Sequence, residues 1–223
     1  MSMVRCLLIL TAVCSGAALA QAPDDGARQQ ALTSYFRSVQ MDDAKTVQKM
    51  VSARLVHPDQ RDPRSGEPAL IVALREGAAS VAAALITTPG IDLEAHAPNG
   101  NTALMLAAYK GNRPVVEALL EKGAKVNQPG WNALHNAAAG GDAGITSLLL
   151  AKGAAIDARG PAGFTALMLA AREGQEATVS VLLEAGADTS LLNSEQLTAA
   201  QLADRAEKPR IAAAIRAHGA PAR

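Results

Sequence analysis

The chain has 223 residues and a formal net charge of zero, with 21 basic and 21 acidic side chains. It is 49% hydrophobic but only 2% aromatic, so its core must be built from alanine and leucine rather than from large rings. The balanced charge gives no electrostatic reason to expect nucleic acid or an anionic membrane surface as the main partner.

Residues 1–20 have the pattern of a secretion signal. Arg5 supplies the positive start, Cys6–Val13 the apolar run and Ala18–Ala20 the small-x-small cleavage site. The pattern predicts cleavage after Ala20 and export to a bacterial periplasm. The apolar run is shorter than the roughly 20 residues that cross a bilayer, which disfavours the alternative of a membrane anchor. We therefore expect no membrane span in the mature chain.

The only two cysteines, Cys6 and Cys14, lie inside this segment. Cys14 raises the alternative of a lipid-modified lipoprotein, but the residue before it is Val13 rather than the small residue typical of such sites. The chain from Gln21 onward has no cysteine, which excludes disulfides, thiolate nucleophiles and cysteine-ligated metals from the mature protein.

The next predicted elements are a short polar lead-in, residues 21–28, and a helix pair at Gln30–Gln40 and Ala44–Leu55. We interpret residues 29–64 as an N-terminal cap on the rest of the chain, in which Tyr35 and Phe36 are core anchors rather than a binding feature. The acidic pair Asp42–Asp43 falls at a helix start, where carboxylates favour the helix dipole, so a structural role is expected for both.

A unit of helix, turn and helix is clearest at residues 163–188. Thr165 is placed to cap a helix over Ala166–Arg172, Gly174 to end it, and Gly186 to end a second helix over Ala177–Ala185. Such a hairpin cannot bury its own apolar face, and copies of it recur. Equivalent positions with steps of 34, 30, 33 and 33 are Leu70, Leu104, Leu134, Leu167 and Ala200. A period near 33 indicates a stacked repeat array.

The sequence resembles the ankyrin repeat family at these positions. The helix starts typical of that family appear as Thr102–Ala108, Asn132–Ala138 and Thr165–Ala171. Its Leu-Leu-x-x-Gly-Ala ends appear as Leu119–Ala124, Leu149–Ala154 and Leu182–Ala187. The resemblance implies an all-α solenoid of about six stacked helix pairs, capped at both ends and joined by β-hairpin-like loops.

The predicted boundaries after the N-terminal cap are a divergent repeat at 65–98, three repeats at 99–129, 130–162 and 163–195, and a C-terminal cap with its tail at 196–223. The step of 30 has a local cause. Between Asn127 and Gly130 the chain has only Gln128–Pro129, about three residues fewer than a full loop. Trp131 directly follows this shortened loop.

No catalytic constellation is present in the sequence. The histidines, His57, His96, His135 and His218, fall in different repeats without a metal-ligand spacing, and there is no nucleophile elbow or phosphate-binding loop. We predict no enzyme activity, cofactor or metal. The resemblance implies that His135 hydrogen-bonds backbone near the adjacent hairpin, while Met105 and Met168 take its place in the neighbouring repeats.

Candidate binding residues lie where loops and first helices share one surface, which the resemblance implies is concave and contacts partner proteins. The residue before each helix cap is Asn101, Trp131, Phe164 and Leu197 in turn. Two of these are large aromatics in a chain with five, as in binding hot spots. Trp131 has an alternative role, shielding the core beneath the short loop. The full predicted set is His96, Asn101, Tyr109, Lys110, Trp131, Arg159, Phe164 and Arg172.

The sequence therefore predicts an exported, monomeric, non-catalytic module that binds a protein partner and not nucleic acid. One alternative is a stress-protection or immunity-type inhibitor that binds a single enzyme or toxin. A hydrolase with its site in the loops is a third, which the absent motifs disfavour.

Overall fold

The computed structural model describes residues 25–219, which form twelve α-helices, one 3-10 turn and no β-strand. The helices are α1 Asp25–Gln40, α2 Ala44–Ser52, α3 Ala69–Glu76, α4 Ala79–Ile86, α5 Ala103–Tyr109, α6 Arg113–Glu121, α7 Ala133–Gly140, α8 Ala143–Ala151, α9 Ala166–Glu173, α10 Glu176–Glu184, α11 Ala199–Arg205 and α12 Pro209–Gly219. The turn, η1, is Pro161–Gly163. The predicted signal at residues 1–20, with its cleavage site and Cys14, lies outside the described residues.

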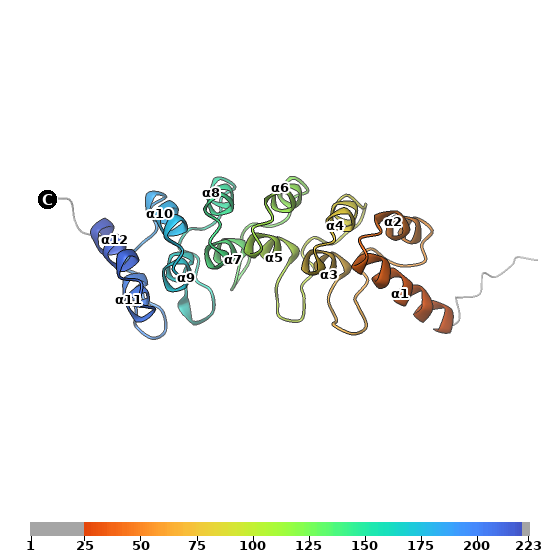
Figure 1. The fold of residues 1–223 in the computed structure, drawn as a ribbon, viewed down its shortest axis with the longest axis horizontal. Helices are drawn as coiled ribbons and strands as arrows, with labels where there is room; N and C mark the ends of the chain where they lie inside the picture. The colour runs from red at the N-terminus through yellow and green to blue at the C-terminus, as the bar shows by residue number, and fades with distance from the viewer. Residues whose placement is uncertain (1–24, 220–223) are drawn as a thin grey trace, which may run out of the picture.

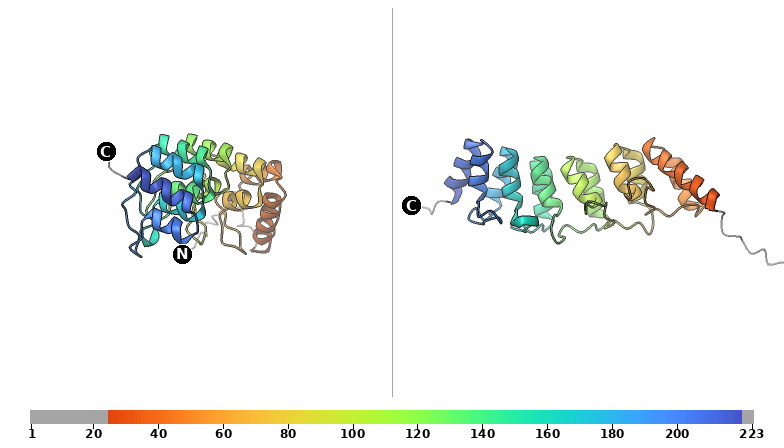
Figure 2. Two further views of the ribbon diagram at one scale, coloured as in Figure 1. Left: turned by 60° about the vertical axis from the view of Figure 1, so that its left-hand side comes forward. Right: turned by 90° about the horizontal axis from the view of Figure 1, so that it is seen from below.

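Six antiparallel helix pairs are stacked along one axis (Figure 1). The odd-numbered helices form one row and the even-numbered helices a second, and within the odd row α3 contacts α5, α5 contacts α7, and α7 contacts α9. The loops that link successive pairs project on the side of the odd-numbered row, away from the even-numbered helices (Figures 1 and 2). The predicted all-α solenoid of six pairs is confirmed.

Local sequence explains where the helices begin and end. The side-chain oxygens of Thr102, Asn132, Thr165 and Thr198 each accept the N–H three residues on, at the starts of α5, α7, α9 and α11. Gly174 ends α9 with φ of 85°, in the left-handed region that a glycine adopts without strain. The predicted roles of Thr165 and Gly174 are both confirmed.

One continuous core runs the length of the array. The leucines at the repeat positions, Leu70, Leu104, Leu134 and Leu167, are all buried, and alanines fill the spaces between the helices of adjacent pairs. Tyr35 and Phe36 are buried at the N-terminal end, where the Tyr35 hydroxyl donates to the Pro58 carbonyl at 3.3 Å. They are core anchors, as predicted.

Two details of the N-terminal pair differ from the sequence-based prediction. Helix α1 begins at Asp25, so it includes residues 25–28, for which the sequence predicts a flexible lead-in. Helix α2 ends at Ser52, three residues before the predicted end at Leu55. The start of α1 and the end of α2 could not be located from the sequence, because the residues at both places are exposed and have no periodic apolar pattern.

The two adjacent aspartates cap two different helices. Asp43 accepts the Thr46 N–H at 3.0 Å and caps α2, its own helix. Asp42, at a φ of 55°, accepts the Val81 N–H at 2.8 Å and the Ser80 hydroxyl at 2.9 Å, and so caps α4 of the next pair. These hydrogen bonds lower the pKa of the Asp42 carboxyl below its ordinary value. The structural role predicted for this pair is confirmed.

Candidate functional site: a groove at the short loop

Five loops join one helix pair to the next, and we call them fingers. Finger 1 spans residues 53–68, finger 2 residues 87–102, finger 3 residues 122–132, finger 4 residues 152–165 and finger 5 residues 185–198. Finger 3 is three residues shorter than fingers 4 and 5, as the step of 30 predicts.

The bases of all five fingers are connected by side-chain to backbone hydrogen bonds. Four carboxylate or amide oxygens each accept an N–H of the next finger, at 2.7–3.0 Å: Asp59 from Asp92, Glu94 from Lys125, Asn127 from Ala155, and Asp157 from Asp188. The base of finger 3 is therefore hydrogen-bonded to its neighbours like the bases of the other fingers. Its short length affects only the tip.

The tips show the difference. A backbone hydrogen bond closes the tip of finger 2 (Ala97 N–H to Asn101 O, 2.8 Å) and of finger 4 (Gly160 N–H to Phe164 O, 2.8 Å). Finger 5 closes in the same way, and finger 1 with one more residue. No backbone hydrogen bond closes finger 3 among the described residues. The row of tips thus has a gap between fingers 2 and 4, which is visible in Figure 1 as the short loop at α7.

A groove of about 370 Å³ lies at this gap. Three of the chain's five aromatic side chains, Tyr109, Trp131 and Phe164, line it, together with Asn101 and Arg172. The remaining lining residues are His135, Asn136, Ala139, Pro161, Ala162 and Leu169. The groove is thus open to solvent and largely apolar, with polar groups at a few points, as in sites that bind side chains of a ligand or partner.

Small residues on α7 deepen the groove. A Cβ atom on Gly140 would stand 2.4 Å from the carbonyl oxygen of Tyr109, so α7 approaches the end of α5 more closely than a side chain there would permit. Ala139 precedes Gly140 and lines the groove. At the same two helix positions α9 has Arg172 and Glu173, so the hollow is specific to α7.

Trp131 has a packed side and an exposed side. Its ring lies edge-on to the imidazole of His135, with ring centres 5.3 Å apart, and a Cβ on Gly160 would come within 2.7 Å of two of its carbons. The side chain still exposes 36% of its surface. The alternative role of Trp131, to shield what lies beneath the short loop, therefore has a structural basis, and the exposed side remains available to a partner.

His135 connects α7 to finger 4. Its Nε2 donates to the carbonyls of Ala158 (3.0 Å) and Phe164 (3.1 Å), and its Nδ1 accepts the Asn132 N–H at 3.3 Å. Burial lowers the pKa of His135 below its ordinary value, while the two carbonyls oppose this, so the neutral ring is favoured. Donation from Nε2 to the carbonyls leaves Nδ1 as the acceptor of the capping hydrogen bond, with the Oδ1 of Asn132 2.8 Å away. The backbone-binding role that the resemblance implies for this histidine is confirmed.

Arg172 and Phe164 form one wall of the groove. The guanidinium carbon of Arg172 lies 5.2 Å from the centre of the Phe164 ring, within the range of a cation–π contact. Phe164 itself packs partly against the core, whereas Tyr109 on the opposite side exposes 55% of its surface. The groove therefore combines the exposed aromatic side chain of Tyr109 with the guanidinium of Arg172, which lies against the ring of Phe164.

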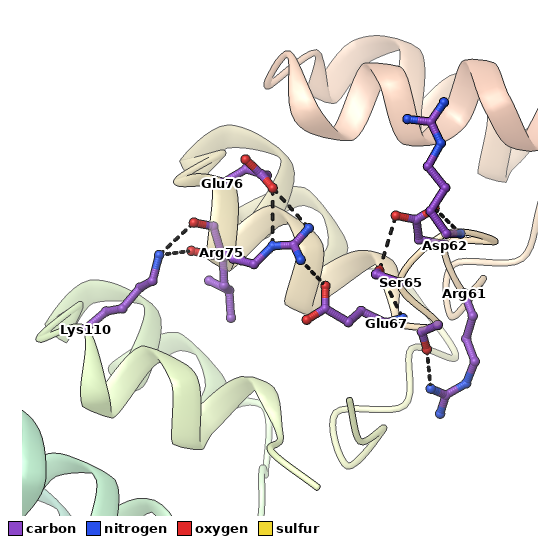
Figure 3. A network of polar contacts seen from close by, with 10 residues as sticks. Arg61, Asp62, Ser65, Glu67, Arg75, Glu76 and Lys110 are labelled. Carbon is purple, nitrogen blue, oxygen red and sulfur yellow. Dashed lines mark hydrogen bonds and ion pairs between the residues drawn. The ribbon is translucent and has the colours of Figure 1, made fainter. Parts of the chain in front are cut away.

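The other three predicted site residues do not line this groove. Lys110 donates from Nζ to the carbonyls of Leu74 (3.2 Å) and Arg75 (2.7 Å), so it caps the carboxyl end of α3 (Figure 3). Arg159 donates to the Leu192 carbonyl at 2.8 Å and connects fingers 4 and 5. His96 lies on finger 2, with its Nδ1 3.1 Å from the Gly100 carbonyl.

Among the lining residues, the sequence-based set lacks five that have small, aliphatic or amide side chains: Asn136, Ala139, Pro161, Ala162 and Leu169. One signal for them was available. Ala139–Gly140 stands where the neighbouring repeats have Tyr109–Lys110 and Arg172–Glu173, and a loss of bulk at an otherwise bulky position indicates a hollow. The binding role of the whole set remains a prediction.

Residues 25–219 contain no group of three or more histidine, cysteine, aspartate or glutamate side chains placed to hold a metal ion. Within the same residues, no helix combines the length and the apolar character needed to cross a membrane.

Comparison with known proteins identifies the architecture. A family model described as "Ankyrin repeats (3 copies)" matches residues 36–129 and 124–193, well over half of the chain. A crystal structure of an ankyrin repeat domain from Acinetobacter baumannii superimposes with a TM-score of 0.71 at 26% sequence identity, and the match covers 83% of this chain and 97% of that one.

The curated relatives are larger or match over short segments. SH3 and multiple ankyrin repeat domains protein 2 of Homo sapiens is 30% identical over 150 residues, which is 66% of this chain and 8% of that protein. Protein fem-1 homolog A-like of Mus musculus is 45% identical over 62 residues, 26% of this chain and 10% of that protein. The chain thus spans about a tenth of the length of these two relatives.

Proposed function

Because the chain belongs to the ankyrin repeat family, we propose that it is a non-catalytic interaction module that binds a partner protein in the groove between fingers 2 and 4. Ankyrin repeats indicate protein–protein interaction, and members of the family are typically not enzymes. The observation that carries the proposal is the gathering of Tyr109, Trp131 and Phe164 at one gap in the finger row.

Physical reasons support this use of the groove. Large aromatics with exposed area are the side chains that contribute most free energy when a partner excludes water from them. Apart from Tyr109 and Trp131, the large apolar side chains that are exposed among the described residues are Met41, Leu55 and Leu192. None of these three lines the groove, whereas Tyr109 and Trp131 both do. The exposed aromatic surface of the described residues is therefore concentrated at the groove.

Export is part of the proposal. Residues 1–20 have the charge, apolar run and small-x-small end of a secretion signal, which supports a mature protein that begins at Gln21 in a bacterial periplasm. We expect this protein to be a monomer. Expression in a Gram-negative host, followed by mass spectrometry of the periplasmic fraction, should show Gln21 as the first residue, and a chain that keeps Met1 in the cytoplasm would contradict the export.

Affinity capture tests the groove. The bait is the protein, the extract is that of its source cells, and the variant is Tyr109→Ala combined with Trp131→Ala. A matched control, Met41→Ala with Leu55→Ala, removes two exposed apolar side chains outside the groove. Each aromatic is expected to contribute about 2 kcal/mol, so the double variant should weaken capture by more than tenfold.

The control should retain the partner that the wild-type protein retains. Thermal melting of all three proteins shows whether the groove variant is folded, since Trp131 also packs on His135 and Gly160. Equal capture by wild type and folded groove variant would contradict the proposed function.

A further inference from the structure

Three of the repeats place an arginine at the same position, the seventh residue of the first helix. These residues are Arg75 in α3, Arg172 in α9 and Arg205 in α11. Each side chain contacts the finger that leads into its helix, at Glu67, Phe164 and Glu195 respectively. We can therefore compare which residues of each finger pair with a guanidinium at the same helix position.

Two of the three fingers offer a carboxylate. Nη1 of Arg75 lies 2.7 Å from a carboxylate oxygen of Glu67 in finger 1, and its Nη2 lies 3.0 Å from Glu76 (Figure 3). Nη1 of Arg205 lies 2.7 Å from a carboxylate oxygen of Glu195 in finger 5. In these repeats, an ion pair between helix and finger is formed within the molecule.

Finger 4 has no acidic residue at either place. Phe164 stands where finger 1 has Glu67, directly before the helix cap, and Ala162 stands where finger 5 has Glu195. Arg172 is instead paired with its chain neighbour Glu173, through Nε at 2.9 Å and Nη2 at 2.8 Å. Among the described residues its Nη1 makes no hydrogen bond or ion pair.

Arg172 is also the only charged side chain that lines the groove, since the buried imidazole of His135 is neutral. Two acidic side chains, one on α9 and one on finger 2, already have partners. Glu173 pairs with Arg172 itself, and Glu94 at the base of finger 2 accepts hydrogen bonds from the Lys125 N–H and the Gln128 amide. The groove thus presents a cation held on an aromatic ring, and Nη1 of Arg172 donates to no acceptor among residues 25–219.

We propose that the segment bound in the groove belongs to another protein chain and places an aspartate or glutamate carboxylate on Nη1 of Arg172, with an adjacent apolar side chain between Tyr109 and Trp131. This inference rests on the proposed function and names the chemistry of the partner. The partner carboxylate takes the role that Glu67 and Glu195 have in the other repeats, in an ion pair with the arginine next to an apolar wall.

The rest of the lining favours a peptide over a sugar. Ala139, Ala162 and Leu169 are aliphatic and would leave most sugar hydroxyls without a partner. Asn136 donates from Nδ2 to the Asn132 carbonyl at 3.1 Å, which leaves its Oδ1 to accept a backbone N–H of a bound segment. An apolar side chain and a peptide backbone fit these groups.

Selection of peptides from a random displayed library on the full chain tests the inference, with competition by the Tyr109→Ala, Trp131→Ala variant to identify groove binders. We expect groove binders to share an aspartate or glutamate beside a bulky apolar residue. The dissociation constants of one such peptide and of its amide counterpart are then measured on wild type and on Arg172→Gln. The carboxylate should improve binding to wild type by at least tenfold and binding to Arg172→Gln by less than twofold.

Two further variants sharpen the result. Arg205→Gln removes a guanidinium from the equivalent position outside the groove and should leave peptide affinity unchanged. Ala162→Glu puts a carboxylate three residues before the helix cap, the sequence position of Glu195 in finger 5, and it should compete for Arg172 and weaken the acidic peptide about tenfold relative to Ala162→Gln. The Ala162→Gln variant is the matched control because both side chains meet the same backbone φ of 55°.

Several outcomes would overturn the inference. Groove-binding peptides without an acidic residue, or equal carboxylate preference on wild type and Arg172→Gln, would reject the carboxylate while leaving the proposed function intact. Peptides that bind the aromatic double variant as well as wild type would reject the groove as the site, and with it the proposed function. Binding of a glycan, but of no peptide, in the groove would reject both.

Discussion

The repeat at α3 and the groove between α5 and α9 differ at equivalent backbone positions, the end of the first helix and the finger beside it. At α3 the end of the first helix is closed by the protein's own side chains, because Arg75 pairs with Glu67 and Glu76, and Lys110 caps the helix carbonyls (Figure 3). At the groove the equivalent positions carry Tyr109, Ala139 and Arg172, and the finger between them is short.

The difference indicates that the residues of the proposed binding groove are largely distinct from those that stabilise the array. The leucine and alanine core and the hydrogen bonds at the finger bases continue unchanged through the groove repeat. The variation lies in the tips, in the outward helix positions and in one buried position, where α7 has His135 and its neighbours α5 and α9 have methionine. Substitutions at the groove should therefore divide into those that disturb the core or the finger bases, with large effects, and those at outward positions, with small ones.

Replacement of His135 should have the largest effect. His135→Ala removes two hydrogen bonds to finger 4, part of the α7 cap and the contact with Trp131, and we expect a loss of about 3 kcal/mol in the free energy of unfolding. His135→Met introduces the residue that α5 and α9 have at this position and should cost about half as much. Urea denaturation of both variants measures the difference, which is the contribution of packing because neither Ala nor Met makes the imidazole hydrogen bonds. Equal losses would show that filling the space at this position contributes nothing and that the lost hydrogen bonds account for the whole effect.

The same residue predicts a pH dependence. Because burial lowers the pKa of His135 below its ordinary value of 6.5, the unfolded chain takes up a proton near pH 6.5 that the folded chain does not. The free energy of unfolding should therefore fall as the pH is lowered from 7 to 5. In His135→Met this decrease should be smaller, and an unchanged slope would contradict a neutral buried imidazole.

Gly140 should come next. Gly140→Ala forces a Cβ to within 2.4 Å of the Tyr109 carbonyl oxygen, so α5 and α7 must separate, and we expect a loss of about 2 kcal/mol despite the better helix propensity of alanine. Glu173→Ala is the matched control at the same position of α9 and should change stability little. Thermal denaturation compares the two, and a more stable Gly140→Ala would show that the close approach is not needed.

Arg75 should matter less than these two. Arg75→Gln leaves the Glu67 carboxylate, whose side chain is only 16% exposed, without a cation, and we expect a loss of about 1 kcal/mol. Chemical denaturation measures it. If Glu67→Gln in the Arg75→Gln background restores stability, the cost is that of the unpaired carboxylate.

Arg172→Gln should have the smallest effect on stability. The Arg172–Glu173 pair is exposed, and such pairs contribute at most about 0.5 kcal/mol. The contrast with Arg75→Gln in the same denaturation series is the informative quantity. If Arg172→Gln destabilises as much as Arg75→Gln, Arg172 is structural and the two regions do not differ as described.

Much of the fold was predictable because its determinants are local. The caps at Thr165 and Asn132, the stop at Gly174 and the recurrence of buried leucine depend on residues within one or two helical turns, and all appear in the structure. The short finger 3 was predictable for the same reason, since it is a matter of counting residues.

The use of individual polar side chains was not predictable in this way. Lys110, Arg159 and His96 were chosen as candidate binding residues, but the structure places them outside the groove, and the first two bond to carbonyls 33 to 36 residues away along the chain. A lysine or arginine side chain is long and flexible, so several acceptors in the adjacent repeat are possible partners. Only the stacking of the repeats decides which of these acceptors is near.

The sequence by itself determined the repeat, the positions of its caps and stops, the shortened loop and the presence of aromatics beside it, because each depends on short-range patterns. Only the tertiary structure decided that Tyr109, Trp131, Phe164 and Arg172 line one groove, that Gly140 lets α7 lie close to α5, and that Arg172 lacks the finger carboxylate that Arg75 and Arg205 have. The reason is that these relations join residues of successive repeats, whose distances are set by how the helix pairs stack.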